Sequence, residues 1–213
     1  RMIAAFNSGV DVHRQTAAEV FQVPLDAVTP EQRSAAKAIN FGIVYGISSF
    51  GLAKGTNLSR AQAQQYIDQY FTRYPQVKAY LDNIVKSAKE QGYVTTLLNR
   101  RRYLPDIKSK NYQRRSFAER MAMNTPIQGS AADIIKMAML KVDQSLRANN
   151  LRAQLLLQVH DELVLEVPED EITLVAALIK QSMESVIELA VALEVEVKIG
   201  TDWENVKPMN EVK

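Results

Sequence analysis

Two adjacent carboxylates, Asp161 and Glu162, are the residues of this chain best suited to metal chemistry. They close the run QVHDE at 158–162, which lies between apolar stretches at 155–157 and 163–165. The β-branched and aliphatic residues on both sides favour extended backbone, so the pattern predicts a tight β-hairpin over 153–167 with the carboxylates at its tip. Carboxylate oxygens on a rigid turn suit a hard cation such as Mg²⁺. The alternative is an ordinary solvated turn, where acidic residues are also common.

A helix is predicted over residues 30–46, upstream of the carboxylates. Thr29 is a suitable N-cap, Gln32 completes a capping box with it, and Pro30 fits the first helical position. Gly46 supplies a C-terminal stop. Gly42 lies inside the helix, where glycine costs about 1 kcal/mol relative to alanine. Its presence indicates that some group approaches the backbone closely there.

One stripe of this helix carries two cations followed by two aromatic rings: Arg33, Lys37, Phe41 and Tyr45. Steps of four residues keep these side chains near one face. The cations and the helix N-terminus attract phosphates, and the rings can stack on a base or pack against a sugar. The pattern therefore predicts a nucleotide lying along the helix. The alternative is an amphipathic helix whose rings are buried and whose cations are solvated.

The two motifs, in this order, resemble those of the family A DNA polymerases. The resemblance runs from Asp11-Val12-His13 to Trp203 and includes the segment NTPIQGSAAD at 124–133. It implies an α+β, mostly helical fold. Residues 1–120 would form a fingers-like helical nucleotide-binding region. Residues 121–213 would form the C-terminal part of a palm, with the catalytic hairpin and a C-terminal strand in a small antiparallel sheet packed on helices.

The resemblance also implies roles in binding deoxynucleoside triphosphates. The residues that match the family's triphosphate ligands are His13, Arg33 and Lys37. Phe41 would pack near the sugar. Tyr45 would lie by the nascent base pair and exchange place with the template base.

Catalytic and DNA-binding roles follow from the same resemblance. Asp161 would be one of two aspartates that hold two catalytic Mg²⁺ ions, with Glu162 as its acidic neighbour. Two metals activate the primer 3′-hydroxyl and stabilise the leaving pyrophosphate. Lys37 would neutralise charge on that leaving group. The residues expected against primer–template DNA are Arg120, Asn124, Gln128 and His160.

The family's other metal-binding aspartate lies in a motif resembling DYSQIE, which does not occur here. The thumb and the first half of the palm have no counterpart either, and the chain starts at Arg1 without an initiator Met or visible leader. We therefore expect an excised fragment of a DNA-directed DNA polymerase of replication and repair. It would be inactive by itself and would need the remainder of the parent polymerase.

Two other functions remain open from the residues alone. The first is a non-catalytic DNA-binding fragment that uses the same basic and polar contacts. The second is a metal-dependent phosphohydrolase built on Asp161 and Glu162. It would need further carboxylates near the hairpin tip, and nothing in the spacing brings Asp133 or Asp202 there.

Composition sets only broad bounds. The 213 residues are 46% hydrophobic, enough for a core, and the net charge of +2 does not by itself predict nucleic-acid binding. A local basic patch comprises Arg100, Arg101, Arg102, Lys108, Lys110, Arg114, Arg115 and Arg120, with Tyr103 and Tyr112 interleaved. The alternative for such a run is a solvated charged loop, but beside the two motifs we interpret the patch as a contact with backbone phosphates. The absence of cysteine is compatible with a reducing cytoplasm, and no apolar run is long enough for a membrane. We expect a cytoplasmic, nucleoid-associated bacterial protein with no membrane partner.

The remaining pattern is mostly helical. Apolar spacing of three and four predicts helices at 59–72 and 75–91. Further helices are expected at about 112–124 and 127–148 and from about 170 to 191. Arg120, Asn124 and Gln128 would share one face if that backbone is helical, but Pro126 predicts a kink or a new helix start. Short strands are expected at 93–98 and 194–199. The second could pair with the hairpin, and the 127–148 helix should underlie it.

Overall fold

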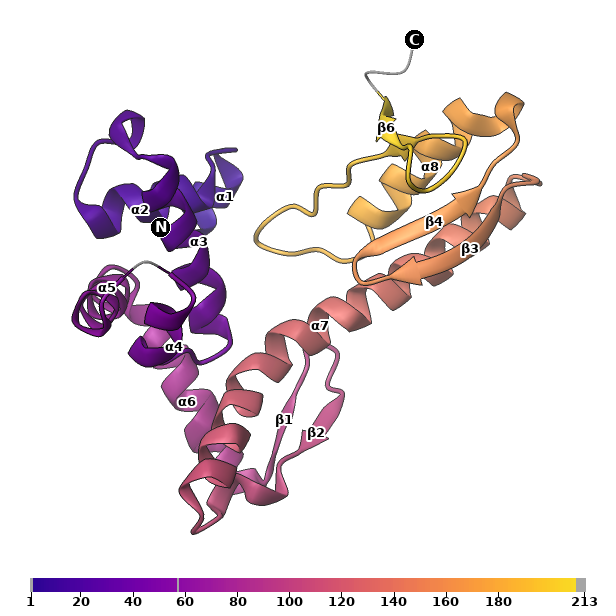
Figure 1. Cartoon of the computed structure of the whole chain (residues 1–213). Helices are drawn as coiled ribbons and strands as arrows, with labels where there is room; N and C mark the ends of the chain where they lie inside the picture. The colour runs from indigo at the N-terminus through magenta and orange to yellow at the C-terminus, as the bar shows by residue number, and fades with distance from the viewer. Residues whose placement is uncertain (1, 57, 210–213) are drawn as a thin grey trace. The chain divides into compact units, whose positions relative to one another are not determined.

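The computed structural model describes residues 2–56 and 58–209. The chain forms two compact units that divide between Ser130 and Ala131, inside the long helix α7 (Tyr112–Ala148) (Figure 1). Each unit has its own hydrophobic core. Among the described residues, no helix is both long enough and apolar enough to cross a bilayer.

The first unit is helical apart from one short hairpin. Its elements in chain order are α1 (Met2–Asn7), α2 (Val12–Phe21), a 3₁₀ turn (Leu25–Ala27), α3 (Pro30–Val44), α4 (Ser49–Lys54), α5 (Arg60–Arg73), α6 (Pro75–Gln91), β1 (Tyr93–Thr95), β2 (Arg101–Tyr103), a second 3₁₀ turn (Pro105–Lys108) and the first part of α7. The sequence predicted α3, α5 and α6 to within a few residues. Their ends are marked by local signals, because Thr29 and Ser59 both form capping boxes and Gly92 ends α6 with a φ of 80°.

Three buried clusters of described residues hold this unit together, and the smallest consists of Ala17, Val28 and Ala36. Side chains from α2 to α6 meet in the first, which includes Val20, Ile39, Ile43, Leu52 and Ile67. The second joins α6, the β1–β2 hairpin and α7 through Ala88, Val94, Leu104, Ile107, Ala118 and Ala122. Because Ile39 and Ile43 lie in the first cluster, the buried face of α3 fixes which side chains of that helix face solvent.

The long helix α7 passes through Pro126 without ending, so the predicted break between two helices is wrong. A proline inside a helix costs about 3 kcal/mol. Contacts with the β1–β2 hairpin offset this cost. Ser130 Oγ donates to the Pro126 carbonyl and accepts from the Leu97 N–H, and Arg102 Nη1 donates to Thr125 Oγ1 at 3.2 Å. The hairpin thus supports the helix at the turn that proline weakens.

The second unit places a hairpin on two helices. After α7 come β3 (Gln154–Val159), β4 (Glu162–Glu166), a 3₁₀ turn (Glu169–Glu171), α8 (Ile172–Glu184), β5 (Lys198–Ile199) and β6 (Lys207–Pro208). The expected hairpin is confirmed as an antiparallel pair with an irregularity between Leu155 and Leu157. Val142 and Leu146 of α7 pack in one cluster with Leu163, Leu165 and Val175. The helix expected beneath the hairpin therefore lies there.

Two expectations for the C-terminal region are wrong in detail. Helix α8 ends at Glu184 rather than near 191. At its end, Lys141 Nζ donates a hydrogen bond to the carbonyl of Ser185, the residue that follows the helix, at 2.9 Å. The strand expected at 194–199 shrinks to β5, which pairs with β6 and not with the hairpin. Asp202 accepts from the backbone N–H groups of Glu204 and Asn205, and this turn brings β6 beside β5. Local pairing therefore replaces the long-range pairing.

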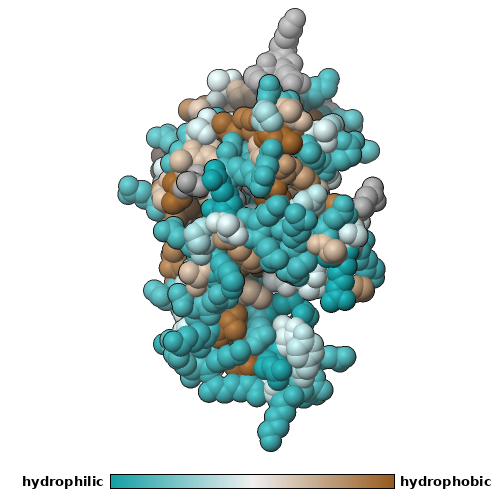
Figure 2. All heavy atoms as spheres, turned by 90° about the vertical axis from the view of Figure 1, so that its left-hand side faces the viewer, coloured by the Kyte–Doolittle hydropathy of each residue, from teal (hydrophilic) through white to brown (hydrophobic). Residues whose placement is uncertain are grey.

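The face shown in Figure 2 is mostly hydrophilic, with hydrophobic residues in separate patches. Scattered apolar exposure is normal for a folded protein. Such patches do not identify a site by themselves, so the candidate site rests on specific polar and aromatic side chains.

Candidate functional site

The cation–aromatic stripe of α3 is exposed over its whole length. Arg33 and Lys37 are exposed, and Phe41 and Tyr45 are 53% and 50% exposed. The opposite face is buried through Ala36, Ile39 and Ile43. The alternative in which the two rings belong to the core is therefore wrong. Lys37 forms no ion pair with any residue that the structure describes, and its Nζ lies 6.0 Å from the centre of the Phe41 ring.

The glycine inside α3 is explained by a neighbour in the same chain. A methyl group added at Gly42 would lie 2.6 Å from Cγ2 of Ile47. The predicted close approach is thus confirmed, and the approaching group is a side chain of the segment after the helix. This contact folds the chain back where α3 ends and leaves Tyr45 on the surface.

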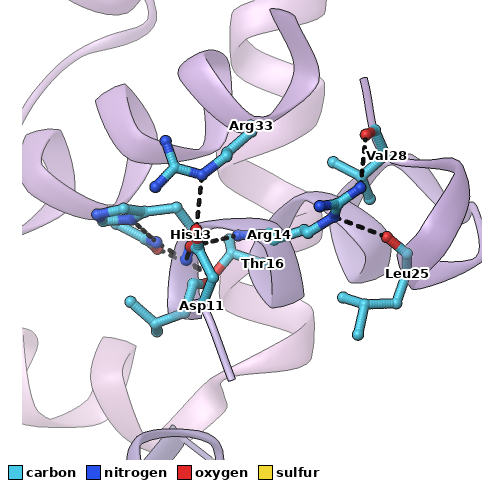
Figure 3. Close-up of polar contacts among 9 residues, drawn as sticks. Asp11, His13, Arg14, Thr16, Leu25, Val28 and Arg33 are labelled. Carbon is cyan, nitrogen blue, oxygen red and sulfur yellow. Dashed lines mark hydrogen bonds and ion pairs between the residues drawn. The ribbon is translucent and has the colours of Figure 1, made fainter. Parts of the chain in front are cut away.

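Asp11 joins the start of α2 to α3, as Figure 3 shows. Its Oδ1 caps α2 by accepting from the backbone N–H groups of His13 and Arg14 at 2.9 and 3.0 Å. Its Oδ2 accepts from Arg33 Nε at 2.7 Å. One carboxylate therefore sets the direction of the Arg33 side chain and the position of the turn that carries His13.

His13 lies against the stripe. Its ring centre is 5.7 Å from that of Phe41, and its Nδ1 is 3.0 Å from Asn40 Nδ2. Burial lowers the pKa of His13; Arg33 and Lys37 add to this effect, while Asp11 opposes it. The imidazole is therefore neutral near pH 7. The three expected triphosphate ligands, His13, Arg33 and Lys37, thus gather at one end of an exposed helix.

The other end of α3 lies against α7. Gly46 has a φ of 64°, and a methyl group there would lie 3.1 Å from Cγ of Arg120 and would overlap Cε of Met123. Arg120 therefore neighbours the segment that follows Tyr45. Its guanidinium lies 5.8 Å from the centre of the Phe117 ring.

The three expected DNA ligands of α7 lie on one uninterrupted helix. Because α7 continues through Pro126, Arg120, Asn124 and Gln128 keep the four-residue spacing that places them along one side. Arg120 and Gln128 are exposed. Within the described part of the chain, the Asn124 Nδ2 atom is buried and has no hydrogen-bond partner. An unsatisfied amide costs free energy unless a partner is supplied.

The hairpin of the second unit presents the two carboxylates. His160 and Asp161 form the turn, with a left-handed φ of 53° at His160, and Gln158 Nε2 donates to the His160 carbonyl at 2.6 Å. Glu162 opens β4 opposite Val159. Asp161 and Glu162 are exposed, and their oxygens fit part of the ligand set of a hard cation. Among the described residues, no three His, Asp or Glu side chains gather closely enough to hold a metal by themselves.

The base of the hairpin is fixed by a separate charged cluster. Glu171 accepts from the backbone N–H groups of Arg152 and Ala153, and Arg152 also pairs with Asp170. The hydrogen bond from the Arg152 backbone N–H is the largest influence and lowers the pKa of Glu171; burial opposes it, and the Arg152 side chain and the Ala153 N–H lower the pKa further. The start of β3 is therefore held independently of the turn.

Sequence reasoning missed two residues of this site, Asp11 as the partner of Arg33 and Asn40 as the partner of His13. A signal existed for each. Asp is a favoured N-cap, and asparagine is unfavourable inside a helix unless its amide has another use. Neither signal names the partner, because both contacts join α2 to α3.

Comparison with known proteins gives a consistent result. The family model described as DNA polymerase family A matches residues 1–205. DNA polymerase I of Caldicellulosiruptor bescii is 56% identical over 207 residues, and that of Bacillus caldotenax is 54% identical over 206 residues. Each alignment covers 97% of this chain but only 24% of the relative, so the chain spans about a quarter of their length.

Solved structures agree with the family model. The POL domain of Pol1 from M. smegmatis, in complex with DNA primer-template and dNTP, matches with a TM-score of 0.86 and 48% identity. That match covers 91% of this chain and 34% of the other. The chain therefore belongs to the family A DNA polymerases.

Proposed function

We propose that this chain supplies the nucleotide-binding helix and one metal-binding carboxylate of a DNA-directed DNA polymerase. The observation that carries the proposal is the exposed stripe of α3, with His13 beside it. Arg33 and Lys37 bind the triphosphate, with His13 as a third contact. Phe41 packs on the sugar and Tyr45 lies at the nascent base pair.

The hairpin carries the metal-binding part of the site. Asp161 holds Mg²⁺ together with a carboxylate from the rest of the polymerase, and Glu162 lies beside it. When bound, two such ions supply activation of the primer 3′-hydroxyl and stabilisation of pyrophosphate. Lys37 adds a positive charge on the leaving-group side. The two carboxylates at the hairpin turn fit only part of the ligand set of a metal ion among the described residues. This supports a site whose remaining ligands come from the rest of the polymerase.

Primer–template DNA is the proposed partner of α7 and the hairpin turn. Arg120, Asn124, Gln128 and His160 contact the duplex, and minor-groove contacts can check base-pair shape without reading sequence. The M. smegmatis relative was solved with DNA primer-template and dNTP, which supports these substrates. We assign residues 1–120 to the fingers and 121–213 to the palm, and place the protein with the bacterial chromosome in the cytoplasm.

A metal-dependent phosphohydrolase is less well supported. Such an enzyme would need more carboxylates at the hairpin turn. Asp133 is buried in α7, and Asp202 is engaged in its own turn with Asn205. The candidate that competes with polymerase is a DNA-binding fragment without turnover.

Primer extension tests the proposal. The chain is assayed with Mg²⁺ and four deoxynucleotides, alone and with a separately made piece that carries the upstream palm and thumb. We expect no extension by the chain alone and recovery on addition of the piece. Salt-dependent duplex binding without recovery would favour the DNA-binding fragment. Extension by the chain alone would overturn the shared metal site.

Matched variants assign the roles in the reconstituted enzyme. Lys37→Ala should raise the KM for deoxynucleotides, whereas Lys54→Ala, an exposed lysine of α4, should not. Asp161→Asn should abolish extension while duplex binding persists. Glu169→Gln, beyond the other end of the hairpin, is the control for removal of an exposed carboxylate. An unchanged rate for Asp161→Asn would remove the metal assignment.

A further inference from the structure

We propose that Asn40 is a positioning residue that holds His13 as the neutral tautomer protonated on Nε2. His13 then offers a directed N–H donor to a phosphate rather than a positive charge. The tautomer stands on the geometry alone, and only its use in nucleotide binding rests on the proposed function.

The orientation of the Asn40 amide is set by Thr16. Asn40 Nδ2 lies 3.0 Å from His13 Nδ1 and 3.1 Å from Thr16 Oγ1. The single hydroxyl proton of Thr16 goes to the carbonyl of Val12, at 2.8 Å, which is shorter than the 3.3 Å contact with Asn40 Oδ1. The Thr16 oxygen therefore accepts from the amide nitrogen, which lies nearer to it than the amide oxygen does. Thr16 is completely buried, so this anchor is shielded from water.

The tautomer follows from counting hydrogens. An amide nitrogen carries two donors, and here one points to Thr16 and the other to His13 Nδ1. Nδ1 must then offer a lone pair, and the ring proton resides on Nε2. An imidazolium would place an N–H on Nδ1 opposite the Asn40 N–H, so the contact disfavours the charged form.

The surroundings act in the same direction. The charged groups that face His13 are Asp11 on its own turn and Arg33 and Lys37 on α3. Burial is the largest influence and lowers the pKa of His13, as do both cations, while Asp11 alone raises it. A neutral ring also avoids adding a third positive charge near Arg33 and Lys37. The donor Nε2–H therefore persists across neutral pH, where a free histidine would titrate.

The tautomer can be read directly, because the chain contains only two histidines, His13 and His160. Nitrogen NMR of the chain with isotope-labelled histidine reports protonation at each ring nitrogen, and His13→Gln assigns the signals. We expect His13 to show a bare Nδ1 and a protonated Nε2 at neutral pH. Asn40→Asp should invert this pattern or protonate both nitrogens, because a carboxylate accepts from Nδ1–H. A protonated Nδ1 in the wild-type chain would overturn the proposal.

Two controls separate positioning from general structural damage. Asn83→Asp introduces the same charge on the exposed face of α6 and should leave the His13 signals unchanged. Thr16→Val removes the anchor of the amide and should give a mixture of tautomers without altering His13 itself. An Asn40→Asp chain that folds and keeps the wild-type tautomer would also overturn the proposal.

The use of the tautomer is tested in the polymerase reconstituted with its upstream piece. Asn40→Leu should raise the KM for deoxynucleotides by about ten-fold, the scale of one hydrogen bond to a charged group, with a smaller change in kcat. In a His13→Gln background the same change should have little further effect, because the two residues act through one contact. Additive effects would overturn the positioning role. If His13→Gln itself leaves KM unchanged, the nucleotide role of His13 fails while the NMR result still decides the tautomer.

Discussion

Arg33 Nε lies 2.7 Å from Asp11 Oδ2, and the other oxygen of the same carboxylate caps the helix that carries His13. The Nη atoms of Arg33 form no hydrogen bond to any residue that the structure describes. The ion pair therefore uses one edge of the guanidinium and leaves the rest for an anion. Asp11 therefore couples the geometry of two expected triphosphate ligands, Arg33 through the ion pair and His13 through the cap.

Asp11→Asn should weaken this coupling while keeping the cap, because asparagine is as good an N-cap as aspartate. The lost ion pair is half exposed, with side chains 45% and 38% accessible, so solvent screening keeps the stability loss at about 0.2–1 kcal/mol. Urea unfolding at neutral pH measures this loss. Asp143→Asn, which breaks the exposed helical pair with Arg147, is the matched control and should cost no more than about 0.5 kcal/mol.

The stability difference between the wild type and Asp11→Asn should also depend on pH, in a direction set by the pKa of Asp11. Burial raises the pKa of Asp11, but hydrogen bonds from Arg14 and Arg33 and the charge of Arg33 together lower it below the ordinary 3.8. The carboxylate therefore stabilises the fold above pH 3.8 and loses this contribution as pH falls through the lowered value. The stability gap between wild type and Asp11→Asn should close in acid. A gap independent of pH would contradict the ion-pair account.

Alanine substitutions at Gly46 and Gly9 should distinguish the cost of backbone strain from the cost of steric overlap. Both have positive φ, 64° and 67°, but a methyl group at Gly46 meets Met123 and Arg120, whereas one at Gly9 meets nothing within 4 Å. Gly9→Ala should cost about 1 kcal/mol for the left-handed backbone. Gly46→Ala should cost about 1–3 kcal/mol more because of overpacking. Met123→Ala should relieve that excess in a double-mutant cycle, and equal costs for the two glycines would show that α7 does not press on Gly46.

The elements that sequence reasoning placed are those whose signals are local. The capping box of Thr29 fixes the start of α3, and the apolar runs at 155–157 and 163–165 indicate the hairpin that presents Asp161. Such signals act within a few residues of chain, so they can be read without the fold.

What escaped prediction depends on contacts between elements. The helix through Pro126 needs Ser130 and Arg102 to accept the proline, and the end of α8 needs Lys141 from α7. The partners of Arg33 and His13 come from α2 and from the interior of α3. Spacing predicted that the stripe binds a nucleotide, but only the folded chain showed which side chains orient the stripe.

Alkaline pH should unfold the chain through its buried tyrosines. Burial raises the pKa of Tyr70 to about 12, with a further contribution from Tyr74, and Tyr70 is only 3% exposed. Because the unfolded value is 10.0, stability is intact below pH 10.0 and falls as pH rises toward about 12. Tyr70→Phe should flatten this fall in urea titrations, whereas Tyr112→Phe, 72% exposed, should not. Equal slopes for the two variants would contradict the assignment.

Asn124 should lower the stability of the free chain and strengthen its binding to duplex DNA. Its buried Nδ2 has no partner among the described residues, and the Oε1 atom of Gln69 on α5 is in the same condition. Replacement of either by leucine removes an unsatisfied polar atom and should raise stability by up to about 1 kcal/mol. Only Asn124→Leu should weaken duplex binding, because Asn124 lies between Arg120 and Gln128 on α7. Urea unfolding and fluorescence anisotropy with a labelled primer–template measure the two effects. If Asn124→Leu bound the duplex as tightly as Gln69→Leu does, the unsatisfied amide would be a defect of packing and not a contact reserved for DNA.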